Sequence, residues 1–220
     1  MEDLNHLVTL FEEHSNPANA LPMQKYMKNH FPFLGIKTPL RRQLTRNFYN
    51  ETGILKKDLN LELVTQLWKK DEREYQYAAQ DYLVRSIKKV NSSHLTFIEE
   101  LITTKSWWDT VDVLSPHIVG NIAKVTPSMI EETIEGWAFG EHLWLTRSSI
   151  LFQLKYKEET NENILYKYIK ANATSKEFFI QKAIGWALRE YSKTNPDSVR
   201  QFINETPLQK LSVREGSKYI

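Results

Sequence analysis

A segment near the middle of the chain concentrates residues that could hold a cation. It reads Ser-Trp-Trp-Asp-Thr-Val-Asp over residues 106–112. On a helix, Trp108 and Asp112 are four positions apart and share a face. An indole face attracts a cation by about 0.5–2 kcal/mol, and a carboxylate adds a full opposite charge. We interpret the pair as a candidate site for a positively charged ligand. The alternative is that Trp108 belongs to the core and that Asp112 only pairs with Arg147.

A constant step along the sequence connects this segment with other side chains. Steps of 35 residues lead through four polar or amphipathic residues of otherwise apolar helical segments: Tyr77, Asp112, Arg147 and Lys182. If this step is the true repeat, the four form a line on one face. Trp186 lies one turn beyond Lys182 on the same face. Gly185 beside it permits the close approach of a backbone or a ligand, although glycine weakens a helix.

Aromatic and basic residues also alternate near the amino terminus. Tyr26 stands between Lys25 and Lys28, and Arg41 and Arg42 occur early in a predicted helix, near backbone N–H groups that could share a phosphate. Nucleic-acid surfaces use aromatic side chains for stacking and cations for phosphates. Each of these residues, taken alone, is more often an ordinary surface residue.

The elements that position these residues are predicted to be helices. The 7 glycines and 8 prolines fall between apolar segments of helical period, and almost no stretch alternates with period two. An apolar face of helical spacing predicts a first helix around residues 4–11. Thr38-Pro39 predicts a helix start with Thr38 as N-cap. Thr126-Pro127 predicts a helix over residues 129–137, and Asn195-Pro196 marks another start.

Helical segments recur at a regular interval. They begin near Glu74, Ser106, Glu141 and Lys176, and each is followed by a second helix, with a spacing of roughly 32–36 residues, close to a compact HEAT or armadillo-like unit. Such helix pairs must stack on their neighbours to bury their apolar faces. We predict an all-α fold, an α-solenoid of helix-pair repeats. It forms a single domain over residues 1–220, with a helical cap at about 1–60 and the repeats over 61–220.

Composition narrows the classes of partner. The 29 basic and 27 acidic residues argue against a protein that coats phosphate non-specifically. Residues 61–140 are acidic, whereas both flanking parts are basic. The two basic parts could bind a polyanion, with a carboxylate of the acidic part near the centre of the bound region. The alternative is solvated helix faces with chance asymmetry.

Several kinds of chemistry find no motif in the sequence. No cysteine is present, the six histidines lack metal-ligand spacing, and no nucleotide-binding loop, serine-hydrolase elbow or metalloprotease motif occurs. We therefore predict neither a cofactor nor a metal. The acidic start lacks the features of a secretory signal, and the apolar stretch Val113 to Ala123 is too short to span a bilayer. A soluble, cytoplasmic protein without membrane contact is expected.

Three segments resemble bacterial AlkD-like DNA alkylation-repair glycosylases. They are residues 24–42 (QKYMKNHFPFLGIKTPLRR), residues 106–112 (SWWDTVD) and residues 144–147 (WLTR), and the resemblance covers essentially the whole chain. It implies a HEAT-like solenoid whose concave face holds duplex DNA. It also implies hydrolysis of the N-glycosidic bond of cationic N3- or N7-alkylated purines in base excision repair, in the bacterial cytoplasm and on the nucleoid when DNA is bound.

The resemblance also assigns residues. Trp108 and Trp186 match the family's aromatic site positions, Asp112 its catalytic carboxylate, Arg147 the arginine of the same site, and Tyr26 an aromatic residue that faces DNA. A fixed carboxylate would stabilise the oxocarbenium ion that forms on the sugar and position the attacking water. The expected catalytic set is Asp112, Trp108, Trp186 and Arg147. The expected DNA contacts are Tyr26, Arg41, Arg42, Arg147, Lys182 and Arg189.

Two rival functions remain at the sequence level. The same solenoid could be a non-catalytic module that binds damaged or distorted DNA or a protein partner, or a protein scaffold indifferent to DNA. A monomer is expected. Because no loop that could wall a deep base pocket is evident, we also expect weak dependence on base flipping and selection by the charge and lability of the lesion.

Overall fold

The computed structural model describes residues 2–220, and no strand occurs among them, so the predicted all-α fold is confirmed. Contacts divide the chain into two compact units, Met1–Val90 and Asn91–Ile220. The expected boundary near residue 60 therefore falls inside the first unit. The first unit contains α1 (Glu2–Glu13), α2 (Pro17–Tyr26), α3 (Thr38–Thr52), α4 (Leu61–Lys69) and α5 (Arg73–Arg85).

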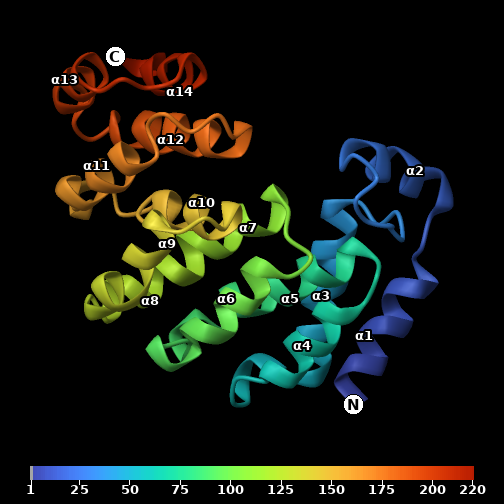
Figure 1. The fold of residues 1–220 in the computed structure, drawn as a ribbon. Coiled ribbons are helices and arrows are strands. Elements are labelled where there is room, and N and C mark those ends of the chain that lie inside the picture. The colour runs from blue at the N-terminus through green and yellow to red at the C-terminus, as the bar shows by residue number, and fades with distance from the viewer. Residues whose placement is uncertain (1) are drawn as a thin grey trace. The chain divides into compact units, whose positions relative to one another are not determined.

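Most helices of the second unit are shorter, and π-helical segments occur at Ser115–Val119 and Ile130–Ile134. Figure 1 shows their order along the chain. Its helices are α6 (Leu95–Thr103), α7 (Trp108–Leu114), α8 (Gly120–Val125), α9 (Glu135–Phe139), α10 (Leu143–Leu151), α11 (Glu162–Ala171), α12 (Phe178–Tyr191), α13 (Pro196–Glu205) and α14 (Lys210–Gly216).

The repeat period predicted from the sequence is present in the structure. Helices α5, α7, α10 and α12 begin at Arg73, Trp108, Leu143 and Phe178, each 35 residues after the one before. Hydrogen bonds between successive pairs have similar offsets, for example 35 residues for Arg147 with Asp112 and 32 for Lys167 with Glu135. Repeated helix pairs of this kind are the construction of an α-solenoid.

In the first unit, a buried carboxylate fixes the loop that leads into α3. Glu74 of α5 is fully buried and accepts hydrogen bonds from the backbone N–H groups of Leu34, Gly35 and Ile36 at 2.9–3.0 Å. Gly35 has φ +88°, and a Cβ there would lie 2.0 Å from the Asn16 carbonyl oxygen. These contacts set where α3, with its arginines, begins.

In the second unit, the helices form two layers. One layer contains α7, α10, α12 and α14, each packed on the next, as the progression from green to red in Figure 1 also shows. The other contains α9, α11 and α13, with α9 against α11 and the rings of Tyr166 and Phe202 stacked between α11 and α13. Between the layers lies a core that includes Ile150, Ile169 and Ile184. The first layer presents the face that carries the candidate site.

The predicted helix starts compare well with the observed ones. Asn195 caps α13, because its side chain accepts the Ser198 N–H. Thr38 is not the N-cap. The first helical hydrogen bond runs from the Arg41 N–H to the Lys37 carbonyl, so Lys37 precedes the helix and Thr38 is its first residue. The helix predicted after Thr126-Pro127 is present, but it opens with the π segment before α9.

None of the helices in residues 2–220 is long and apolar enough to cross a bilayer.

Candidate functional site

A pocket of about 380 Å³ opens on the α7–α14 layer of the second unit. Four successive helices of the layer contribute to it. Six predicted residues line the pocket: Trp108, Asp112, Arg147, Lys182, Trp186 and Arg189. Phe178, Phe179 and Glu215 also line it and were not predicted from the sequence. Of the four residues connected by the 35-residue step, Asp112, Arg147 and Lys182 lie together in this pocket, whereas Tyr77 does not line it.

An ion pair between neighbouring repeats forms the floor of the pocket. Arg147 donates from Nε to Asp112 Oδ1 at 2.8 Å and from Nη2 to Oδ2 at 2.9 Å. The Arg147 side chain is only 4% exposed, whereas that of Asp112 is 17% exposed. This bidentate geometry fixes the plane of the carboxylate. The alternative predicted from the sequence holds for the pairing of Asp112 with Arg147. It does not hold for Trp108, which is partly exposed and lines the same pocket instead of a closed core.

The remaining nitrogen of the Arg147 guanidinium, Nη1, also has a partner within the protein. Arg147 Nη1 donates to the backbone carbonyl of Phe179, whose ring centroid lies 5.9 Å from the guanidinium carbon. Phe179 packs at 5.0 Å, between centroids, against both Trp107 and Trp144. Trp107 is thus a packing residue of this aromatic cluster. The cluster therefore holds Arg147, and Arg147 in turn holds Asp112.

The electrostatics of Asp112 follow from this environment. Burial raises the pKa of the Asp112 carboxyl above its ordinary value, and the hydrogen bonds and charge of Arg147 oppose that rise. Each carboxylate oxygen offers about two lone-pair positions, and Arg147 occupies one on each. The remaining positions are available to a ligand or a water molecule in the pocket.

Aromatic side chains form the walls. Trp108 and Trp186 are both partly exposed and line the pocket from α7 and α12. Phe178 opens α12 and is 57% exposed beside them. The sequence could have indicated Phe178, because this residue lies 70 residues, or two repeat steps, after Trp108. Indole and phenyl faces next to a carboxylate favour a cationic or planar ligand.

A basic cluster with one carboxylate at its centre also lines the pocket. Glu215 of α14 pairs with Lys182 at 3.3 Å and with Arg189 at 3.1 Å. It also pairs with Lys218 at 2.7 Å, and Arg214 lies 3.8 Å from it. The Glu215 side chain is 9% exposed. Four cations around one carboxylate leave an excess of positive charge beside the tryptophans.

The expected DNA contacts of the first unit differ in accessibility. Tyr26, the last residue of α2, is 70% exposed, and Arg42 is exposed on α3. Arg41 is buried, donates to Asp81 at 3.3 Å and lies over the ring of Tyr77. Tyr26 and Arg42 therefore present surface that a ligand can reach, whereas the guanidinium of Arg41 is engaged within the unit.

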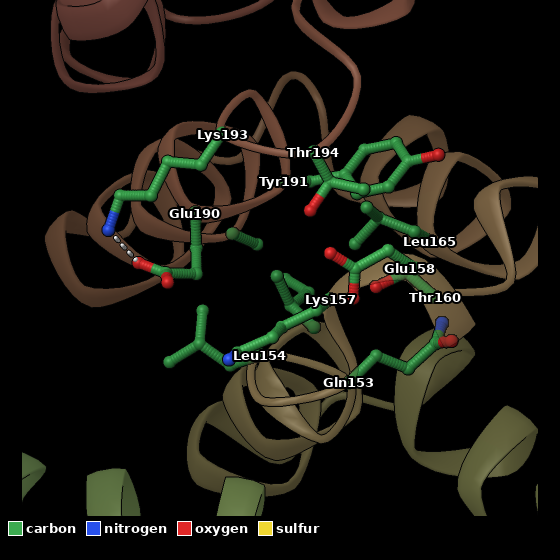
Figure 2. A pocket seen from close by; sticks show the side chains of 12 residues that line it. Gln153, Leu154, Lys157, Glu158, Thr160, Leu165, Glu190, Tyr191, Lys193 and Thr194 are labelled. Atoms are coloured by element: carbon green, nitrogen blue, oxygen red, sulfur yellow. Dashed lines mark hydrogen bonds and ion pairs between the residues drawn. The ribbon is translucent and has the colours of Figure 1, made fainter.

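A second pocket, of about 210 Å³, lies in the same unit and is shown in Figure 2. It contains none of the predicted site residues. Its charged side chains balance, with Lys157 and Lys193 against Glu158 and Glu190. Lys193 Nζ lies 2.7 Å from Glu190 Oε2 in an ion pair. Without an excess charge or a fixed unpaired group, this pocket gives no indication of the chemistry above.

Comparisons with known proteins agree on one class. The family model described as "DNA alkylation repair enzyme" matches residues 7–220. A solved structure titled "Predicted DNA alkylation repair enzyme from Enterococcus faecalis" is 34% identical, with a TM-score of 0.84, over 94% of this chain and 96% of that one. No curated protein matches the sequence.

The all-helical fold that carries this pocket is thus shared with a class of repair proteins. The chain belongs to the DNA alkylation repair enzyme family.

Proposed function

We propose that the protein is a DNA N-glycosylase that releases cationic N3- or N7-alkylated purines from duplex DNA. The observation that carries the proposal is the carboxylate of Asp112, fixed by Arg147 in a pocket walled by Trp108 and Trp186. Membership of a family of DNA alkylation repair enzymes supports alkylated DNA as the substrate. No metal or cofactor is invoked, because the chemistry needs only charge and position.

The reaction breaks the bond between C1′ of the deoxyribose and the alkylated purine. An alkylated purine already carries a positive charge, so it takes the bonding electron pair and departs as a neutral base. Positive charge then develops on the sugar as an oxocarbenium ion. A preorganised carboxylate stabilises that charge most strongly at this moment. Asp112 also accepts a proton as water attacks C1′, which leaves an abasic deoxyribose.

The tryptophans contribute binding and selectivity. Trp108 and Trp186 pack against the sugar and backbone of the lesion nucleotide, and their indole faces favour its positive charge. Phe178 joins them as an exposed aromatic residue. Tyr26 and Arg42 of the first unit contact the duplex outside the lesion. Because the aromatic residues recognise charge, we propose weak dependence on base flipping and selection by the charge and lability of the lesion.

We assign Arg147 to positioning Asp112. Arg147 was also predicted to contact DNA, but three of its donors are engaged within the protein and its side chain is 4% exposed. Arg41 is likewise given a structural role through Asp81 and Tyr77. Lys182 and Arg189 line the pocket with side chains that are 38% and 26% exposed, so they are the better candidates for phosphate contact.

The variant Asp112→Asn tests the catalytic assignment. It keeps the size of the side chain and removes its charge, so the release of N7-methylguanine should fall by at least about 100-fold while duplex binding persists. The matched control is Asp109→Asn, which removes the same charge from the same helix at a residue outside the pocket lining. Equal losses in both variants would contradict a specific role for Asp112.

The alternative function is a non-catalytic module that binds damaged or distorted DNA or a protein partner. It predicts that the wild-type protein binds the lesion duplex and releases no base. In that case Asp112→Asn changes affinity only.

A further inference from the structure

We infer that Glu215 organises a phosphate-binding subsite, in which Lys182 and Arg189 receive a phosphodiester group adjoining the lesion nucleotide. Glu215 is a positioning residue in this scheme and does not touch the substrate. The inference deepens the proposed function and rests on it, because it names the group that holds the DNA strand beside Asp112.

The first step is the geometry on α12. Lys182, Trp186 and Arg189 follow one another at spacings of four and three residues and lie on one helix face. All three line the same pocket. The two cations therefore flank the indole of Trp186 along the helix. A nucleotide whose sugar packs on Trp186 has its phosphate within reach of one or both cations.

The second step is what holds the long basic side chains in place. Glu215 Oε1 lies 3.3 Å from Lys182 Nζ, and Glu215 Oε2 accepts from Arg189 Nη1 at 3.1 Å. Each oxygen of the carboxylate therefore engages a different cation. Lys218 contacts the same carboxylate at 2.7 Å. Lys218 and Lys182 lower the pKa of Glu215 to about 2, so the carboxylate stays charged throughout the physiological range.

The third step is how α14 reaches this position. A Cβ on residue 185 would lie 2.5 Å from Glu215 Cβ and 3.1 Å from the Ser212 carbonyl oxygen. Only glycine leaves room for such an approach. Gly185 was singled out in the sequence as a point of close approach, and the structure shows that the approaching element is α14. The glycine beside Trp186 thus brings Glu215 next to Lys182 and Arg189.

The fourth step is charge. Lys182, Arg189, Arg214 and Lys218 surround one carboxylate that is 9% exposed, which leaves an excess of three positive charges. The Asp112–Arg147 pair in the same pocket is neutral overall. A phosphodiester group is negative and reduces this excess of positive charge, whereas the cationic base would increase it. The subsite therefore favours the phosphate of the strand, and the Asp112 end favours the cationic base.

The test uses Glu215→Gln in the full chain. Loss of the carboxylate frees Lys182 and Arg189 but adds net positive charge. Base release from a lesion duplex should fall by about tenfold, equivalent to about 1.4 kcal/mol, while affinity for undamaged duplex stays equal or rises. If both quantities fall together with the melting temperature, Glu215 is only structural. If both rise, it is only a counter-charge. Either result overturns the inference.

A binding measurement separates this inference from the proposed function. The probe is a duplex with a stable abasic-site analogue in which single phosphates near the analogue are replaced, one at a time, by neutral methylphosphonates. Wild-type affinity should fall by about tenfold at one position, and the fall should vanish in Glu215→Gln. A subsite revealed in this way by a protein that releases no base refutes the glycosylase alone. Uniform sensitivity at every position refutes the subsite alone.

The control is Glu159→Gln. Glu159 pairs with Lys124 at 2.7 Å, is 64% exposed and does not line the pocket, so the variant makes the same charge change elsewhere in the unit. It should leave both the base release and the methylphosphonate pattern unchanged. A loss equal to that of Glu215→Gln would attribute the effect to net charge and overturn the inference.

Discussion

At the scale of single residues, the pair of Asp112 and Arg147 concentrates the chemistry. Burial disfavours the charged form of Asp112, and the hydrogen bonds and charge of Arg147 partly offset this effect. A carboxylate in this environment interacts strongly with a neighbouring cation, because little solvent screens it. The same burial makes the pair sensitive to the loss of either partner.

The pH dependence of base release follows from the raised pKa of Asp112. Catalysis needs the ionised carboxylate, so the enzymatic rate should fall as the pH decreases through this pKa. The acid limb should lie above about pH 3.9, the ordinary value for aspartate. The measurement is single-turnover release of N7-methylguanine, after subtraction of uncatalysed release at each pH. A rate that stays constant as the pH falls below about 3.9 would contradict the role of Asp112.

Replacement of Arg147 should shift the acid limb of the pH profile of base release. Arg147→Met leaves Asp112 without its counter-ion, so the pKa of Asp112 should rise further and the acid limb should shift to higher pH. The loss of one partner of a buried pair costs about 3–5 kcal/mol of folding free energy. Arg147→Lys keeps a charge without the bidentate geometry and should shift the limb less. If both variants bind DNA more weakly but keep the wild-type pH profile, Arg147 acts on phosphate instead.

At the scale of elements, helix spacing predicted part of the site. Trp108 and Asp112 share a face because they are four residues apart on α7, and Trp186 follows Lys182 by one turn of α12. Glu215 could not be placed in this way. Its position depends on the packing of α14 against α12, a tertiary contact that no local pattern records. Gly185 gave only the signal that something approaches there.

Gly185→Ala should therefore be destabilising, although alanine is the better helix former. The added methyl group meets the Cβ of Glu215, a position that rotation of the side chain cannot move, and overpacking of this kind costs about 1–3 kcal/mol. Gly136→Ala is the matched control. Gly136 lies in α9 with nothing within 4 Å of an added Cβ, so alanine there should stabilise by roughly 0.5–1 kcal/mol. Chemical denaturation measures both, and equal effects would contradict the close approach.

At the scale of the whole molecule, the 35-residue repeat was readable because apolar faces recur at that interval. It predicted the helix starts near Glu74, Ser106, Glu141 and Lys176 to within two residues of the observed ones. The burial of Arg41 could not be predicted from the sequence, because nothing in the local pattern around Arg41 indicates its contacts with Asp81 and Tyr77. Which charged residues face solvent depends on tertiary contacts between repeats.

Salt should weaken the binding of duplex DNA. Each phosphate contact contributes a slope of about −0.9 in a plot of log affinity against log salt concentration. Lys182→Ala should reduce the magnitude of this slope by about 1. Fluorescence anisotropy between 50 and 200 mM salt, about the range in which such contacts respond, measures both slopes. Affinity insensitive to salt would support the protein scaffold instead.

Lesion charge should decide which bases are released. Neutral lesions such as hypoxanthine or 1,N6-ethenoadenine gain nothing from the carboxylate and the indole faces, and they are poorer leaving groups. Duplexes that carry these bases at one position should show release no faster than the uncatalysed reaction. Robust excision of either base would contradict selection by charge.

The most direct measurement is the identity of the bases that the protein releases from methylated duplex DNA. Wild-type protein should liberate free N7-methylguanine and N3-methyladenine and leave abasic sites in equal number. Asp112→Asn should bind the same DNA and liberate neither base above the spontaneous rate. The absence of any released base with the wild-type protein, or release at the wild-type rate by Asp112→Asn, would contradict this account.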